Sequence, residues 1–176
     1  MNKSTLNIKH RKIISSFSLP FCFLSLYLIF DYLYSGLSTE TLRTYYLDYF
    51  VSFCGFIINI ITPNEKISII QNSIISTKAN LSVVRTCDGS TTFFLISAAI
   101  LVVKSKLKLT IVGIFIALIL ILSLNTIRIV SLFYLIPYDS LWFSYFHETI
   151  APFLLVSISC GYFSFWAQHA NKVKRG

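Results

Sequence analysis

The sequence has few charged residues: only 12% of its 176 residues are Asp, Glu, Lys or Arg, whereas 55% are hydrophobic. Its mean hydropathy is accordingly high, at +0.72. A soluble domain of this length has too much surface relative to its core to bury so many apolar side chains. The apolar residues also fall in long blocks rather than in an amphipathic stripe. The composition excludes an ordinary soluble domain and predicts a multi-pass integral membrane protein.

Acidic residues are scarcer than basic ones, with 7 Asp and Glu against 15 Lys and Arg and a formal net charge of +8. In a soluble protein this balance would suggest nucleic-acid binding. Here the basic residues sit in short clusters at the ends of apolar blocks, as the positive-inside rule describes. We therefore expect the lipid bilayer as a partner and no nucleic acid.

The sequence also lacks the Cys and His spacings of metal sites, since it contains no CxxC pair. Cys22, Cys54 and Cys160 lie in apolar blocks, where cysteine usually acts as a small buried hydrophobic residue. Cys87 differs because it lies in the polar stretch 85–90. We expect no metal and no cofactor, and we treat Cys87 as the cysteine with a candidate chemical role.

The apolar blocks predict an all-α polytopic membrane protein with four to five transmembrane helices. The polar loop 63–86 shows short alternating segments near 66–69 and 80–83, which predict a small outward-facing β-hairpin. We divide the chain into a basic N-terminal segment (1–12), a transmembrane domain (13–166) and a basic cytoplasmic tail (167–176). The candidate spans are 13–34, 47–62, 88–103, 109–136 and 142–166.

The role of the short block 47–62 decides the topology. If it crosses the membrane, there are five spans and the Lys and Arg residues divide almost evenly between the two sides. If residues 36–62 instead lie along or dip into the outer face, there are four spans and the N-terminus is cytoplasmic. We favour the second arrangement because it places most basic residues inside. Both arrangements put the loop 63–86 outside the plasma (inner) membrane.

The block 109–136 is unusually long. At 1.5 Å per residue it measures about 42 Å, whereas the hydrocarbon core is about 30 Å thick. We expect this span to bend, tilt or break near Asn125 to Arg128.

Cys87, Arg128 and His147 are the polar residues that a membrane span should not tolerate without a reason. Measured from the cytoplasmic ends of their helices, they reach depths of about 25, 30 and 28 Å. Three separate helices therefore bring them to one level near the outer surface. The shared depth predicts that the three side chains form one site.

The chemistry of these residue types suits nucleophilic catalysis. A thiolate at Cys87 is a strong nucleophile, and the imidazole of His147 can accept its proton. The Arg128 guanidinium can stabilise an acyl oxyanion. Asn125 lies one helical turn before Arg128, and Asp88 either caps the helix after Cys87 or opposes a negative thiolate. Taken singly, each residue also fits a structural role as a loop cysteine, a snorkelling arginine or an interfacial histidine.

Three short motifs in order resemble the exosortase/archaeosortase family of membrane cysteine transpeptidases. They are Cys87-Asp88-Gly89, the segment 125–129 (Asn-Thr-Ile-Arg-Ile) and the later His147. The family has a Cys-x-Gly element, an Asn-x-x-Arg-Ile/Val element and a later His. The similarity covers about residues 50–166 and suggests a short, single-module member, with Asp88 where Ser is common.

The resemblance implies that Cys87 is the nucleophile, His147 the general base and Arg128 the transition-state stabiliser, supported by Asn125 and Asp88. The implied partners are membrane-anchored substrate proteins with a C-terminal sorting tail, which the enzyme cleaves on the outer face and transfers to an envelope acceptor. Two other classes stay open from the residues alone. One is a non-enzymatic membrane assembly subunit, and the other is a small transporter or lipid-head-group enzyme.

Overall fold

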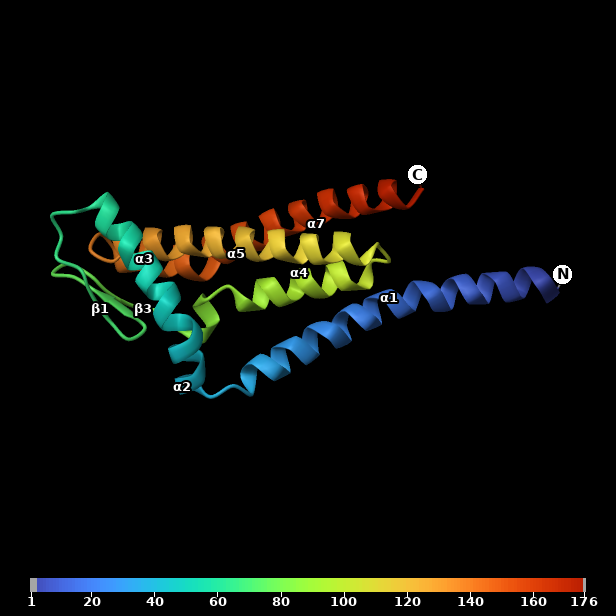
Figure 1. The fold of residues 1–176 in the computed structure, drawn as a ribbon, viewed down its shortest axis with the longest axis horizontal. Helices are drawn as coiled ribbons and strands as arrows, with labels where there is room; N and C mark the ends of the chain where they lie inside the picture. Colours follow the sequence, from blue (N-terminus) through green and yellow to red (C-terminus); the bar gives the residue numbers. More distant parts are fainter. Residues whose placement is uncertain (1–2, 176) are drawn as a thin grey trace.

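The computed structural model describes residues 3–175, so residues 1–2 of the expected N-terminal segment and residue 176 of the expected tail lie outside the described residues. Figure 1 shows a mostly helical molecule in which several helices run along its long axis. Helix α4 packs against each of the other three. These lengthwise helices are α1 (Lys3–Ser35), α4 (Ser90–Val102), α5 (Leu107–Leu135) and α7 (Ala151–Arg175).

A second group of helical elements lies across the end of the molecule that is far from both termini (Figure 1). It begins at Ser38, whose hydroxyl accepts the backbone N–H of Thr41 at 3.0 Å and so caps the first turn. It contains α2 (Thr39–Leu42), the π-helical turn η1 (Arg43–Leu47) and α3 (Asp48–Ile61).

The polar loop folds into a three-stranded antiparallel sheet of order β1-β2-β3 beside α3. The two alternating segments form its outer strands, so they pair through β2 rather than with each other as a hairpin. The central strand, whose Ile74 is completely buried, was not predicted. The strands are β1 (Ser68–Ile70), β2 (Ser73–Ile75) and β3 (Asn80–Ser82).

Within residues 3–175, four helical segments are long and apolar enough to cross a membrane, whereas α4, with 13 residues, is shorter. Figure 1 nevertheless shows α4 running alongside the lengthwise helices and α3 lying across their end. The four-crossing alternative, in which the block 47–62 lies along one face, stays a prediction. The four segments are Ser18–Ser35, Thr39–Ile61, Leu107–Leu135 and Leu141–Val173.

The structure bears on two expectations about the long helices. Of the bend, tilt or break expected near Asn125 to Arg128, the break does not occur, because helix α5 is continuous from Leu107 to Leu135. The last span is longer than expected, because helical structure continues into the basic tail as far as Arg175. It begins as α6 (Ser140–Tyr145), capped by the Asp139 carboxylate, and passes through a second π-helical turn, η3 (Phe146–Ile150).

The core is divided between the two ends of the bundle. At the end that carries the sheet, buried residues of α3, the strands and α5 pack together, and Cys87 belongs to this cluster. At the opposite end, Trp166 of α7 packs with buried residues of α4 and α5. The first cluster fixes the surroundings of Cys87.

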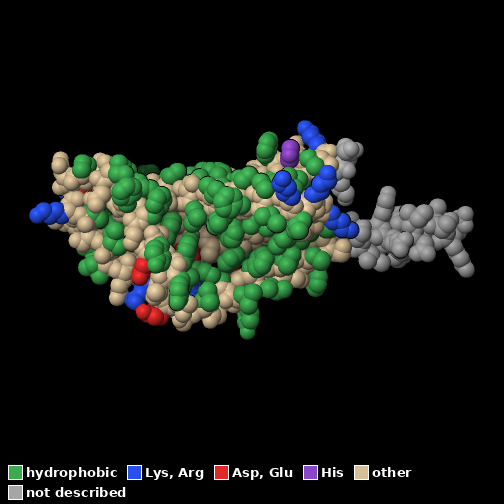
Figure 2. Space-filling model, in the orientation of Figure 1, with side chains coloured by type: hydrophobic (Ala, Val, Ile, Leu, Met, Phe, Trp, Pro, Cys, Tyr) green, Lys and Arg blue, Asp and Glu red, His purple; other side chains and the backbone are tan. Residues whose placement is uncertain are grey.

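Exposed charged side chains lie at both ends of the molecule, with apolar surface between them (Figure 2). Figure 2 shows hydrophobic side chains over its long side and Lys and Arg side chains gathered at the end where α7 terminates. The loop between α4 and α5 reaches the same end (Figure 1). The exposed basic residues there include Lys104, Lys106, Lys108 and Lys172.

Candidate active site

Cys87 and His147 meet at the end of the bundle that carries the sheet. The Cys87 Sγ lies 3.0 Å from the His147 Nε2, although the two residues are 60 positions apart in sequence. Cys87 ends a short 3₁₀ turn before α4 and is 6% exposed, whereas His147 lies in η3 and is half-buried. A thiol and an imidazole at this separation can exchange a proton directly.

Arg128 joins the same site from α5. Its terminal nitrogen Nη2 donates to the backbone carbonyl oxygen of His147 at 3.2 Å. Its Nε is buried and has no hydrogen-bond partner among the described residues. A π-helical turn loosens the regular ladder of backbone hydrogen bonds, and such turns are frequent at functional sites. The turn at His147 therefore exposes a backbone carbonyl that accepts a hydrogen bond from Arg128 Nη2. The second donor of this guanidinium, Nε, stays unpaired among the described residues.

Phe143 orients the imidazole. Its ring is parallel to that of His147, with an interplanar angle of 4° and a centroid separation of 5.8 Å. The two residues are four positions apart, so both rings lie on one face of the helical segment. Sequence reasoning did not select Phe143, although its helical spacing from His147 could have revealed it.

Asn125 and Asp88 hold the turn that carries the nucleophile. Asn125 is completely buried, and its Nδ2 donates to the carbonyl oxygen of Cys87 at 2.9 Å. The Asp88 carboxylate accepts the backbone N–H of Ser90 at 3.1 Å and the Ser90 hydroxyl at 2.8 Å. The N-cap residue of α4 is Gly89, which has no side chain, and Asp88 satisfies the first backbone N–H of the helix from one residue further back.

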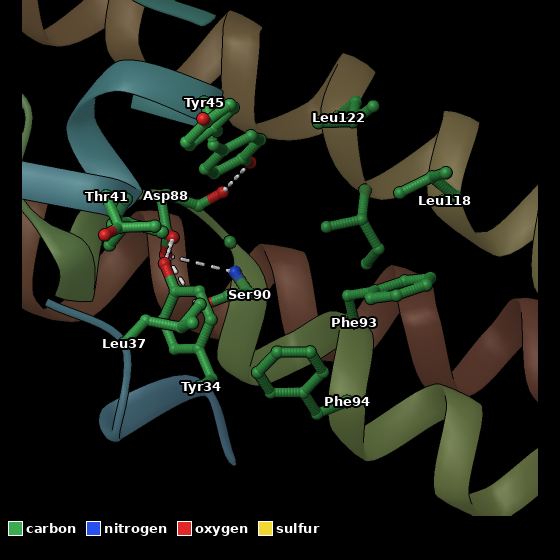
Figure 3. A pocket seen from close by; sticks show the side chains of 14 residues that line it. Tyr34, Leu37, Thr41, Tyr45, Asp88, Ser90, Phe93, Phe94, Leu118 and Leu122 are labelled. Atoms are coloured by element: carbon green, nitrogen blue, oxygen red, sulfur yellow. Dashed lines mark hydrogen bonds between the residues drawn. The ribbon is translucent and has the colours of Figure 1, made fainter. Parts of the chain in front are cut away.

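Two tyrosines from distant parts of the chain also contact Asp88. The Tyr34 hydroxyl, from the end of α1, donates to the Asp88 carboxylate, and Figure 3 shows this pair beside Ser90. The Tyr46 hydroxyl, from η1, donates to the Asp88 carbonyl oxygen at 3.0 Å. Neither tyrosine was among the site residues expected from the sequence.

An apolar groove opens beside this network. One cavity of about 330 Å³ is lined by Asp88, Gly89 and Ser90 together with side chains of α1, η1 and α5 (Figure 3). A second cavity of about 670 Å³ continues along α3 and α5 and shares Tyr45, Tyr46 and Leu122 with the first. Neither Cys87 nor His147 lines either cavity, so the groove lies beside the reactive pair rather than around it.

Comparison with known families decides the identity. A family model described as transmembrane exosortase matches residues 5–164, which is most of the chain. The chain belongs to the transmembrane exosortase family. No curated protein and no solved structure gives a significant match. Membership confirms the resemblance inferred from the three motifs, all of which lie inside the matched range.

Exosortase membership also establishes that the chain is a multi-pass membrane protein, in agreement with its apolar helices. It suggests a role of the membrane transpeptidase type. The chemistry of individual residues depends on the geometry of the site.

Proposed function

We propose that this exosortase is a membrane cysteine peptidase or transpeptidase that cleaves a C-terminal sorting signal on the outer face of the plasma membrane. The observation that carries the proposal is the 3.0 Å contact between Cys87 Sγ and His147 Nε2, next to a buried Arg128 Nε without a partner among residues 3–175. The site lies at the end of the bundle opposite the α4–α5 loop and the C-terminal end of α7 (Figure 1), whose lysines the positive-inside rule assigns to the cytoplasm.

The reaction has two acyl-transfer steps. His147 accepts the proton of Cys87, and the thiolate sulfur attacks the carbonyl carbon of the scissile peptide bond. Arg128 stabilises the oxyanion that forms on the carbonyl oxygen. The C–N bond then breaks, His147 returns the proton to the leaving amine, and the N-terminal part of the substrate stays on Cys87 as a thioester. A nucleophile of the envelope attacks the thioester and releases the thiol.

The substrates in this proposal are membrane-anchored proteins that end in a short motif, an apolar helix and a basic tail. Such a tail places its cleavage motif just outside the bilayer when its basic residues stay in the cytoplasm. The motif then lies at the level of Cys87. The membrane therefore aligns enzyme and substrate in depth.

The test is processing of a co-expressed substrate protein that carries such a tail, followed by its change in mass. We expect Cys87→Ala and His147→Ala to abolish processing. Arg128→Ala should lower the rate about 10²- to 10³-fold, as loss of one oxyanion donor does. Matched controls are Cys160→Ala and His169→Ala, since both side chains are exposed on α7 away from the site.

A thioester gives a second readout. In the wild-type enzyme, hydroxylamine should release the substrate fragment from a covalent adduct that Cys87→Ala lacks. If all three site variants process the tailed substrate as well as the two controls do, the chain is not a transpeptidase. An assembly subunit or a transporter would then account for the fold.

A further inference from the structure

The turn that carries Cys87 is held through two successive peptide carbonyls. Asn125 Nδ2 of α5 donates to the Cys87 oxygen at 2.9 Å, and the Tyr46 hydroxyl of η1 donates to the Asp88 oxygen at 3.0 Å. The two donors come from different elements. Together they restrain the peptide planes on both sides of the Asp88 α-carbon, directly after the nucleophile.

Tyr46 is itself held rigidly. Its ring stacks on that of Phe50 at a centroid distance of 6.0 Å with an interplanar angle of 17°. The side chain is half-buried and packs against the core cluster that contains Cys87. Tyr46 lies in a π-helical turn, as His147 does. The tyrosine that contacts the Cys87 turn and the imidazole that contacts the thiol therefore both project from widened helical turns.

We propose that Tyr46 is a positioning residue for the nucleophile, which acts through its hydrogen bond to the Asp88 carbonyl oxygen and thereby keeps Cys87 Sγ in reach of His147. This inference rests on the proposed function. If Tyr46 has this role, the helical segment 39–61 across the end of the bundle contributes to the active site, because its Tyr46 hydroxyl is the donor.

The physical reason is geometric. Proton transfer from thiol to imidazole requires the two atoms to stay within about 3.2 Å. Removal of the Tyr46 hydroxyl leaves the Asp88 carbonyl oxygen without this donor and lets the peptide plane rotate. The turn then samples positions in which the thiol and the imidazole are too far apart, so the population of the reactive pair falls.

The experiment measures alkylation of Cys87 by iodoacetamide in the purified full-length chain, in a background with Cys22→Ala, Cys54→Ala and Cys160→Ala. The alkylation rate is measured at neutral pH in each variant. The difference between this rate and the rate of His147→Ala is the part of the thiol reactivity that depends on the imidazole. We expect Tyr46→Phe to lower this part about five- to tenfold, which corresponds to the loss of one neutral hydrogen bond.

Three variants make the result specific to positioning. Tyr45→Phe is the matched control, since Tyr45 is the neighbouring tyrosine and is 79% exposed, and it should alkylate at the wild-type rate. Tyr46→His carries a ring N–H donor on a side chain too short to reach the same carbonyl, so it should react as slowly as Tyr46→Phe. Tyr46→Phe combined with His147→Ala should react no more slowly than His147→Ala alone, because the hydroxyl acts only through the pair.

The unfolding temperature of each sample separates positioning from stability. If Tyr46→Phe lowers the unfolding temperature but leaves the His147-dependent rate unchanged, Tyr46 is only a packing residue and the inference is wrong. If His147→Ala does not slow alkylation of the parent chain, the thiol–imidazole pair itself fails, and the proposed function fails with it. The two failures are therefore distinguishable.

Discussion

Gly89 gives the Cys-x-Gly motif a physical reason. Its φ of 81° is a left-handed conformation, and it follows Asp88 just before α4 begins. A Cβ at this position would lie 3.2 Å from a methyl carbon of Ile121 and 3.3 Å from the Asn125 side-chain amide carbon. The motif therefore needs glycine both for backbone conformation and for the close approach of α5.

Substitution of Gly89 should harm both stability and activity. Gly89→Ala forces an L-residue into left-handed backbone at a cost of about 1–2 kcal/mol, and the added methyl pushes Asn125 away from the Cys87 carbonyl. We expect a lower unfolding temperature and at least a tenfold loss of substrate processing. Gly161→Ala is the control, because a Cβ there meets nothing within 4 Å and alanine favours the helix. Equal effects of the two variants would contradict this role of Gly89.

Among single residues, the sequence could predict those site residues that are polar or ionisable and yet lie within or at the end of an apolar span. Cys87, Arg128 and His147 could be grouped by depth because helix rise is regular and the bilayer gives a common reference. Tyr34 and Tyr46 could not be found in this way. They lie 54 and 42 positions from Asp88, and a tyrosine near a span end is ordinarily an interface residue.

Among the elements, the sequence located the apolar helices but not their internal irregularities. The turns η1 and η3 follow no composition signal, since a π-helical turn depends on tertiary contacts such as that of Arg128 with the His147 carbonyl. The long span was expected to bend, tilt or break near Asn125. Helix α5 is not broken there, and the Asn125 amide nitrogen donates to the Cys87 carbonyl rather than to its own backbone.

Helices α5 and α7 pack closely at the end opposite the site. The Tyr162 hydroxyl donates to the Gly113 carbonyl oxygen at 2.7 Å, and the Trp166 indole N–H donates to the Leu109 carbonyl oxygen at 3.3 Å. A Cβ on Gly113 would overlap the Trp166 indole ring. The absence of a side chain at Gly113 is what allows both hydrogen bonds to form.

Enlargement of Gly113 should therefore separate these helices. Gly113→Val should destabilise the fold by roughly 1–3 kcal/mol, the usual cost of overpacking, measured as a lower unfolding temperature in detergent. Gly161→Val, on the open face of α7, is the matched control and should have a much smaller effect. An unfolding temperature for Gly113→Val equal to that of this control would show that the α5–α7 contact is not tight.

For the whole molecule, the arrangement of elements links topology to chemistry. The termini and the loop between α4 and α5 lie at one end, and the sheet, α3 and the thiol–imidazole pair lie at the other (Figure 1). Length and composition favour Thr39–Ile61 over α4 as a span, whereas the packing puts α4 inside the bundle. A protein in which α4 crosses and α3 lies flat has both termini on one side.

This sidedness can be measured with single cysteines in a variant whose native cysteines are replaced by alanine. In intact cells, a membrane-impermeant maleimide should label Lys78→Cys in the exposed sheet loop, whereas Lys106→Cys should react only after permeabilisation. The deciding position is a cysteine in segment 1–12. We expect it to be protected like Lys106→Cys, because four crossings return the N-terminus to the side of the basic loop. Labelling of that cysteine from outside would instead require α3 to cross, and the count would be five.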